Sequence, residues 1–127
     1  MSVELNHTIV AAHDKEASAR FLADLLGLDV APEYGPFTPV QMPNGVTLDY
    51  METDDAISPQ HYAFLVSEED FDTIFSRIRT AGLTYWSDPH HEHTGEINHR
   101  HGGRGAYFDD PNGHRLEILT RPDTDEG

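Results

Sequence analysis

Two stretches of this chain repeat one pattern. Residues 42–51 and 110–119 both contain Pro-Asn-Gly followed by alternating apolar and polar residues, at an offset of 68 (111 − 43). Proline fixes φ and Asn-Gly tolerates positive φ, so each stretch is predicted to be a tight turn that leads into a strand. In this alignment Leu48 corresponds to Leu116 and Asp49 to Glu117. The repeat restricts the chain to folds built from two copies of one unit.

Two further repeats support this interpretation. His7-Thr8-Ile9-Val10 corresponds to His61-Tyr62-Ala63-Phe64 at an offset of 54 (61 − 7), and Gly27-Leu28 to Gly82-Leu83 at 55 (82 − 27). The rise in offset from 55 to 68 places an insertion late in the second copy. The sequence therefore predicts one domain over residues 1–127, with a first module at about 1–53 and a second at about 60–121. Residues 53–60 are the linker, and residues 121–127 an acidic tail.

Hydrophobic periodicity predicts a βαβββ order in each module. The predicted strands of the first module cover residues 5–12, 28–34, 37–42 and 46–52; those of the second cover 61–66, 83–86, 105–109 and 114–119. A first helix begins after Asp14, carries the apolar stripe Ala17, Phe21 and Leu25, and ends at Gly27. A second helix begins at Ser67, carries Phe71, Ile74, Phe75 and Ile78, and ends at Gly82.

Strand alternation separates two sheet faces with different chemistry. One face is largely apolar and is expected to pack on the helices. The other carries His7, Thr47, Asp49, His61, Tyr107, Arg115 and Glu117. Two imidazoles and a carboxylate, here His7, His61 and Glu117, form a ligand set that leaves positions open on a divalent metal ion such as Fe, Mn, Zn or Ni. The predicted fold class is α+β, with two paired βαβββ modules forming a cup-shaped mixed sheet.

Composition excludes several classes of function. The formal net charge of −15 disfavours nucleic acid and anionic membranes as partners, because both require a basic face. There is no cysteine, which removes disulfides, thiolate metal sites and cysteine nucleophiles. No apolar run approaches the length of a membrane span and no secretory signal is present, so a cytoplasmic protein that binds a small molecule is expected.

The pattern resembles the vicinal oxygen chelate superfamily over nearly the whole chain. This superfamily includes glyoxalase I, fosfomycin thiol-transferases, extradiol dioxygenases and bleomycin-resistance proteins. The resemblance implies that His7, His61 and Glu117 hold the metal in a cup between the modules. It also implies a homodimer in which each site can be shared between chains. Residues 5–7, 61–64 and 113–117 are most similar to the fosfomycin branch. The chain departs from that branch at Ile9 and Ser87, where the branch has a hydroxyl and a lysine.

The resemblance leaves several roles open. Asp49 occupies the place of a fourth ligand in glyoxalase-like members, and it can equally serve as a base or as an ion-pair partner of Arg115. Tyr107 lies ten residues before Glu117, as does a tyrosine that assists catalysis in extradiol dioxygenases. The histidine-rich loop at residues 88–104 is interpreted as a solvated loop or as a lid in which His99 or His101 supplies acid–base chemistry.

The function predicted is a metal-dependent enzyme acting on a small molecule with vicinal oxygens. Dioxygenase-type chemistry is favoured because of the three-ligand set with Tyr107. The alternatives are a glyoxalase- or epimerase-like lyase or isomerase, and a non-catalytic drug-binding protein similar to the bleomycin-resistance members.

Overall fold

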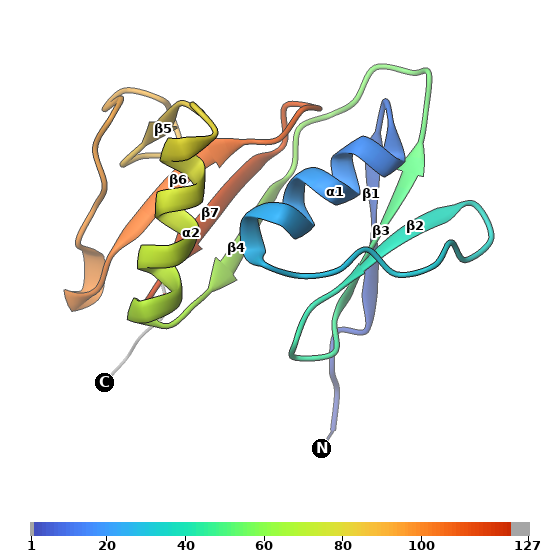
Figure 1. Cartoon of the computed structure of the whole chain (residues 1–127), viewed down its shortest axis with the longest axis horizontal. Helices are drawn as coiled ribbons and strands as arrows, with labels where there is room; N and C mark the ends of the chain where they lie inside the picture. Colours follow the sequence, from blue (N-terminus) through green and yellow to red (C-terminus); the bar gives the residue numbers. More distant parts are fainter. Residues whose placement is uncertain (1, 123–127) are drawn as a thin grey trace. The chain divides into compact units, whose positions relative to one another are not determined.

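The computed structural model describes residues 2–122 (Figure 1). The chain forms two compact units, residues 1–58 and 59–127, each of which is described by itself. The boundary lies inside the predicted linker. Most of the acidic tail predicted at residues 121–127 lies outside the described residues. Within residues 2–122, no helix has the length and apolar character needed to cross a bilayer.

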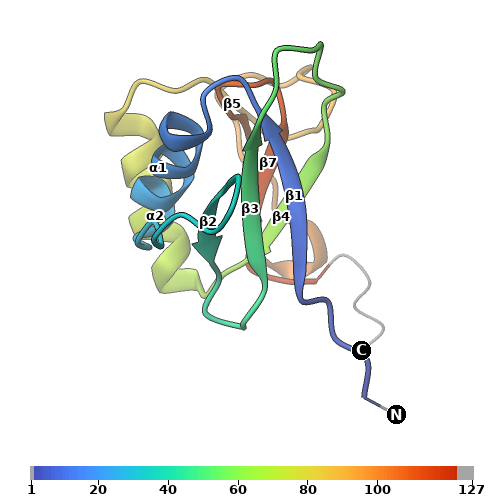
Figure 2. The same cartoon turned by 90° about the vertical axis from the view of Figure 1, so that its right-hand side faces the viewer.

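The first unit is a three-stranded sheet with one helix on it. Its elements are β1 (His7–Ala12), α1 (Lys15–Leu26), β2 (Phe37–Gln41) and β3 (Thr47–Glu52). The strand order is β1-β3-β2, in which β1 runs parallel to β3 and β2 antiparallel to it. Helix α1 lies across one face of this sheet (Figures 1 and 2).

Helix α1 begins and ends where the sequence predicts, but a different face of it is buried. The Asp14 side chain accepts the Ala17 N–H, and Gly27 ends the helix at φ 75°. Ala17 is exposed and Phe21 half-buried, so the predicted stripe is wrong in part. The buried residues are Ser18, Ala19, Leu22, Ala23 and Leu25. Three of these side chains, those of Ser18, Ala19 and Ala23, are small, which lets the helix backbone lie close to the sheet.

The strand predicted at residues 28–34 does not form. Only two isolated bridges exist there, Val30 with Val40 and Tyr34 with Phe37. Pro32 and Pro39 each lack a backbone N–H, so a continuous ladder between this segment and β2 would miss donors on both sides. The first module is therefore βαββ, with its second strand reduced to bridges.

The second unit has the complete βαβββ order that the sequence predicts. Its elements are β4 (His61–Leu65), α2 (Glu68–Thr80), β5 (Tyr85–Trp86), a 3₁₀ turn η1 (Arg100–Gly102), β6 (Gly105–Asp109) and β7 (Arg115–Leu119). The strand order is β4-β7-β6-β5, with β4 parallel to β7. Strand β5 is shorter than the predicted 83–86.

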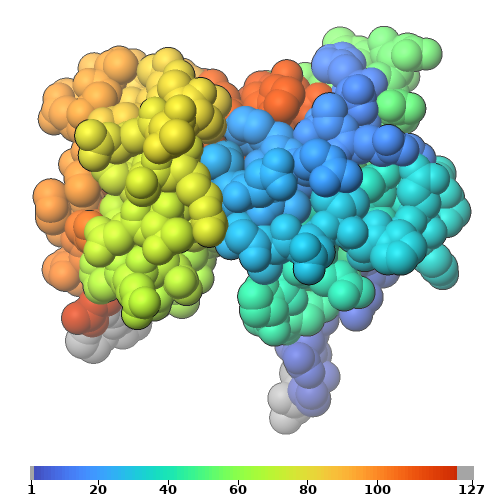
Figure 3. Space-filling model, in the orientation of Figure 1, coloured from blue at the N-terminus to red at the C-terminus, as the bar shows by residue number. Residues whose placement is uncertain are grey.

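Helix α2 matches its sequence pattern closely. Ser67 accepts the Asp70 N–H at the start, and Phe71, Ile74 and Ile78 are buried. Phe75 is half-buried and its ring meets the Tyr85 ring edge-on at 4.9 Å. The outward face of the helix lies at the molecular surface (Figure 3). The prediction of this helix is confirmed.

The two Pro-Asn-Gly turns have the same backbone hydrogen bonds. Met42 N–H donates to Val46 O and Gly45 N–H to Met42 O, as Asp110 N–H donates to His114 O and Gly113 N–H to Asp110 O. Gly45 and Gly113 have φ of 94° and 87°, which favours glycine. The second turn has one addition: the buried Asp110 carboxylate accepts the N–H groups of Asn112 and His114. The sequence repeat is thus a structural repeat.

Candidate functional site

His61 and Glu117 meet on the sheet of the second unit. His61 is the first residue of β4 and Glu117 the middle residue of β7, and His61 Nε2 lies 3.0 Å from Glu117 Oε1. The side chain of Glu117 is 2% exposed, whereas that of His61 is 47% exposed. An ionised carboxylate only accepts hydrogen bonds, so Nε2 carries the proton when no metal is present. A carboxylate buried to this degree requires such a partner.

Tyr107 and Arg100 extend this pair across the sheet. Tyr107 on β6 is the register partner of Glu117, and its ring centroid lies 5.8 Å from that of His61. Arg100 Nη1 donates to the Tyr107 hydroxyl at 2.9 Å. Burial raises the pKa of Tyr107, and the negative charge of Glu117 raises it further, against the opposing effect of Arg100. The phenol is therefore a protonated donor held beside the carboxylate.

Register places these side chains in two rows on one sheet face. His61, Arg115 and Asp109 are partners in the first row, and Ala63, Glu117, Tyr107 and Trp86 form the second. Partners in register point to the same side of a sheet. The opposite face carries the buried Leu116 and Ile118. The predicted separation into an apolar face and a polar face is correct for this unit.

The first unit holds the equivalent positions with fewer functional groups. His7, Thr47 and Gln41 form one row, and Ile9, Asp49 and Pro39 the next. His7 is exposed and its Nδ1 lies 2.7 Å from Asn6 Oδ1. Asp49 is 8% exposed in the centre of β3. His7 and Asp49 thus share one sheet face, as the alternation predicts, and their roles stay predictions.

The His61–Glu117 pair fits part of a metal site. Two ligand atoms about 2.1 Å from one ion, at a right angle, would be about 3 Å apart, which matches the separation of these two atoms. An imidazole and a carboxylate are ligands that Fe, Mn, Zn and Ni accept. Within residues 2–122, no three His, Asp or Glu side chains gather closely enough to hold a metal ion. The second unit therefore supplies two of the three predicted ligands, and His7 belongs to the first unit.

The loop between β5 and β6 is ordered by its own polar groups. The Asp88 carboxylate accepts the N–H groups of His90, Glu92 and His93. Burial opposes ionisation of Asp88, but these backbone donors together lower its pKa. Asn98 and Arg100 both donate to the Ser87 carbonyl. The interpretation of residues 88–104 as a solvated loop is therefore too simple, because the segment folds back on itself and bonds to the sheet residue Tyr107.

The predicted acid–base residues of this loop are exposed. His99 precedes η1, and His101 lies inside it with φ 56°. Their role stays a prediction. Sequence reasoning missed Arg100, which stands between them and bonds to Tyr107, and His91, whose ring stacks on Trp86. No periodic pattern marks either residue, because a loop has no repeat from which orientation could be inferred.

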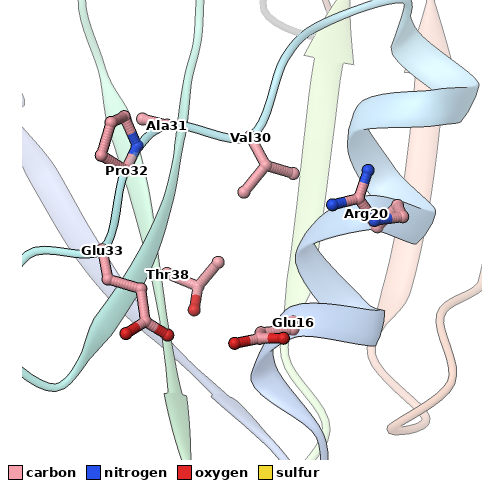
Figure 4. A pocket seen from close by; sticks show the side chains of 7 residues that line it. All are labelled: Glu16, Arg20, Val30, Ala31, Pro32, Glu33 and Thr38. Carbon is pink, nitrogen blue, oxygen red and sulfur yellow. The ribbon is translucent and has the colours of Figure 1, made fainter.

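A separate pocket lies in the first unit. Its lining comes from α1, the segment at 30–33 and β2, namely Glu16, Arg20, Val30, Ala31, Pro32, Glu33 and Thr38 (Figure 4). The Thr38 hydroxyl is buried and has no hydrogen-bond partner within residues 2–122. None of the predicted site residues lines this pocket, so it does not bear on the metal-site prediction.

The chain is similar to several known proteins. Over 126 residues the chain is 35% identical to the glutathione transferase FosA of Serratia marcescens, covering 93% of this chain and 81% of that one. Two solved structures are more similar. Oxidase ChaP-H2 is 74% identical with a TM-score of 0.97 over all of both chains. Oxidase ChaP-H1 is 58% identical with a TM-score of 0.95, over 98% of this chain and 100% of that one.

The family model for these proteins covers almost the whole described fold. It matches residues 4–118, from just before β1 to the penultimate residue of β7, and so includes both copies of the repeat. The match contains His7, His61 and Glu117 at the repeat positions from which the resemblance was inferred. This chain belongs to the Glyoxalase/Bleomycin resistance protein/Dioxygenase superfamily.

Proposed function

We propose that this chain is a metal-dependent oxidoreductase that acts on a small molecule with two adjacent oxygens. The observation that carries the proposal is the 3.0 Å pairing of His61 with the buried Glu117 beside Tyr107. The similarity to two proteins named oxidases, at 74% and 58% identity, favours oxidation over the other reactions of the superfamily.

In this proposal His61 and Glu117 hold a divalent metal together with His7. His7 comes from the same chain or, in a homodimer, from the partner. The bound metal would supply Lewis-acid chemistry toward the adjacent oxygens of the substrate. Glu117, which is itself buried, contributes the negative charge that retains a cation. Tyr107 offers a protonated hydroxyl to a substrate oxygen, and Arg100 fixes the direction of that hydroxyl.

The test is metal content and oxygen uptake, measured on protein purified without a metal-affinity tag. We expect about one Fe, Mn, Zn or Ni per chain in the wild type. We expect oxygen consumption with a panel of catechols and hydroquinones after reconstitution with Fe(II). Glu117→Gln keeps the shape of the side chain and removes its charge, so the bound metal and the oxygen uptake should both be lost.

Two results would redirect the proposal. Metal without oxygen uptake, but with conjugation of fosfomycin to glutathione, would assign the chemistry of the FosA relative. No metal in the wild type, even after reconstitution, would remove the enzyme proposal and leave the drug-binding alternative.

A glyoxalase- or epimerase-like lyase is the second candidate, because Asp49 is buried on the same sheet face as His7. A fourth ligand would leave fewer positions open and suit isomerisation better than oxygen chemistry. Asp49→Ala with unchanged metal content and unchanged activity would remove this candidate.

A further inference from the structure

We propose that His91 is the acid–base residue of this site and that Asp109 orients it, an inference that rests on the proposed function. His91 lies in the loop between β5 and β6. Its ring stacks on the Trp86 indole, with centroids 3.6 Å apart and planes 12° apart, and its Nε2 lies 3.3 Å from Asp109 Oδ1. An imidazole held between an aromatic face and a carboxylate has a fixed ring position and a preferred tautomer.

The strand register places this dyad on the same sheet face as the metal-ligand pair, two strands away. Asp109 belongs to the row of His61, two strands away from it, and Trp86 belongs to the row of Glu117, also two strands away. Neighbouring strands are about 4.8 Å apart, so each separation is about 10 Å along the sheet. All four side chains are on the same face. A substrate that binds at His61 and Glu117 and spans this distance along the sheet face would reach His91.

One oxygen of the Asp109 carboxylate has no hydrogen-bond donor among the described residues. Its Oδ1 atom is buried and has no hydrogen-bond partner within residues 2–122, although the side chain as a whole is 35% exposed. The nearby His91 Nε2 is within ion-pair distance but outside hydrogen-bond geometry. A small rotation of the imidazole would complete the bond. A buried carboxylate oxygen that is left unpaired is costly, so it favours the tautomer of His91 with the hydrogen on Nε2.

Hydrogen bonds to the backbone of the loop also hold His91 in place. His91 has φ 61°, a left-handed conformation that few residues with side chains adopt. The Asp88 carboxylate binds the N–H groups on both sides of it, and the Arg115 guanidinium of β7 donates to the Pro89 carbonyl. Asp109 from β6 thus faces the imidazole itself, while Arg115 from β7 and Asp88 from the loop bind the backbone next to it.

This arrangement allows His91 to take a proton from the substrate and to return it to the product. With Nε2–H directed at Asp109, Nδ1 carries the lone pair and acts as the base. It takes the proton of a substrate hydroxyl: the O–H bond breaks, an N–H bond forms, and the electron pair stays on the substrate oxygen. The resulting imidazolium faces the Asp109 carboxylate, which stabilises its charge, and Nδ1 returns the proton to the product.

The test uses His91→Asn in the full-length protein, because asparagine tolerates positive φ but has no imidazole. His90→Asn, in the exposed neighbouring position, is the matched control. Three quantities are measured after reconstitution with Fe(II): metal content, the visible absorption of bound 4-nitrocatechol as its ionisation changes over about pH 5 to 8, and the pH profile of oxygen uptake.

We expect His91→Asn to retain its metal, to require a higher pH to ionise bound 4-nitrocatechol, and to lose about 100-fold of activity. The His90→Asn control should match the wild type in all three measurements. Asp109→Asn should shift the ionisation in the same direction by less, and the double variant should be no worse than His91→Asn alone.

Two outcomes overturn the inference in distinguishable ways. If His91→Asn lowers the melting temperature but leaves the nitrocatechol ionisation and the pH profile unchanged, His91 only anchors the loop, and the proposed function stands. If the wild type binds no metal, the proposed function is wrong and the inference is lost with it.

Discussion

The two copies of the repeat share a backbone but differ in what their strands carry. Around the central acid of each copy, Asp49 is paired with Ile9 and Pro39, whereas Glu117 is paired with Ala63 and Tyr107. The second copy also has the loop at residues 88–104, which brings Arg100 to Tyr107 and His91 to Asp109. The comparison teaches that the two copies share a scaffold with matching His7 and His61, while only the second copy carries these further polar groups around its central acid.

The test with the largest expected effect replaces the equivalent histidine of each copy with alanine. His61→Ala should abolish metal binding and reduce activity by at least about 100-fold, because it removes the proposed metal ligand that lies 3.0 Å from the buried Glu117. His7→Ala should also release the metal if the first copy contributes a ligand. Elemental analysis of both variants checks this, and retention of metal by His7→Ala would confine the site to the second copy.

A second test compares the two Pro-Asn-Gly turns. Asp110→Ala removes the acceptor of the Asn112 and His114 N–H groups, and His114 is buried, so we expect a loss of about 2 kcal/mol in the free energy of unfolding. Met42→Ala, at the equivalent position, removes no such acceptor and should cost about 1 kcal/mol or less. Denaturant unfolding measures both values. Equal losses would mean that the carboxylate adds nothing to the second turn.

The smallest effect is expected in the loop at residues 88–104, which connects β5 to β6 and has no counterpart in the first copy. The pKa of Asp88 is lowered in the folded protein from its ordinary value of 3.8. The hydrogen bonds that its carboxylate accepts are therefore fully present above this ordinary pKa and are lost as the pH falls through the folded pKa. Acidification below about pH 4 should therefore loosen residues 90–93. Hydrogen exchange of these amides, corrected for intrinsic pH dependence, is the measurement. Residues 28–36 serve as the internal control, and Asp88→Asn should loosen 90–93 already at neutral pH.

Most of the fold could be predicted because the decisive signals were local or repeated. Asp14, Ser67 and Gly27 mark helix ends through their own backbone bonds. The failures have equally local causes. Residues 28–34 look like a strand in composition, but prolines in this segment and in its partner strand leave too few donors. The buried face of α1 was misplaced because Ser18, Ala19 and Ala23 are small, and small residues give a weak hydrophobic signal.

The residues of the candidate site also fall into those that the sequence could place and those that it could not. His61, Tyr107 and Glu117 could be placed on one face because strand alternation and the Pro-Asn-Gly turns fix their orientation. Arg100, His91 and Asp88 could not, because their positions depend on hydrogen bonds across a long loop with no periodicity. The acid–base role predicted for His99 or His101 stays a prediction, and the proposal for His91 competes with it.

The parallel pairing of β4 with β7 also has a consequence for folding. The hairpin of β6 and β7 closes over a few residues and can form quickly, but the contact of His61 with Glu117 spans 56 residues of chain. We therefore expect the His61 imidazole and the Glu117 carboxylate to meet late in folding, after helix α2 and the loop at residues 88–104 have formed. A refolding experiment should recover helical signal before it recovers metal affinity, and the delay between the two would time the closure of this sheet.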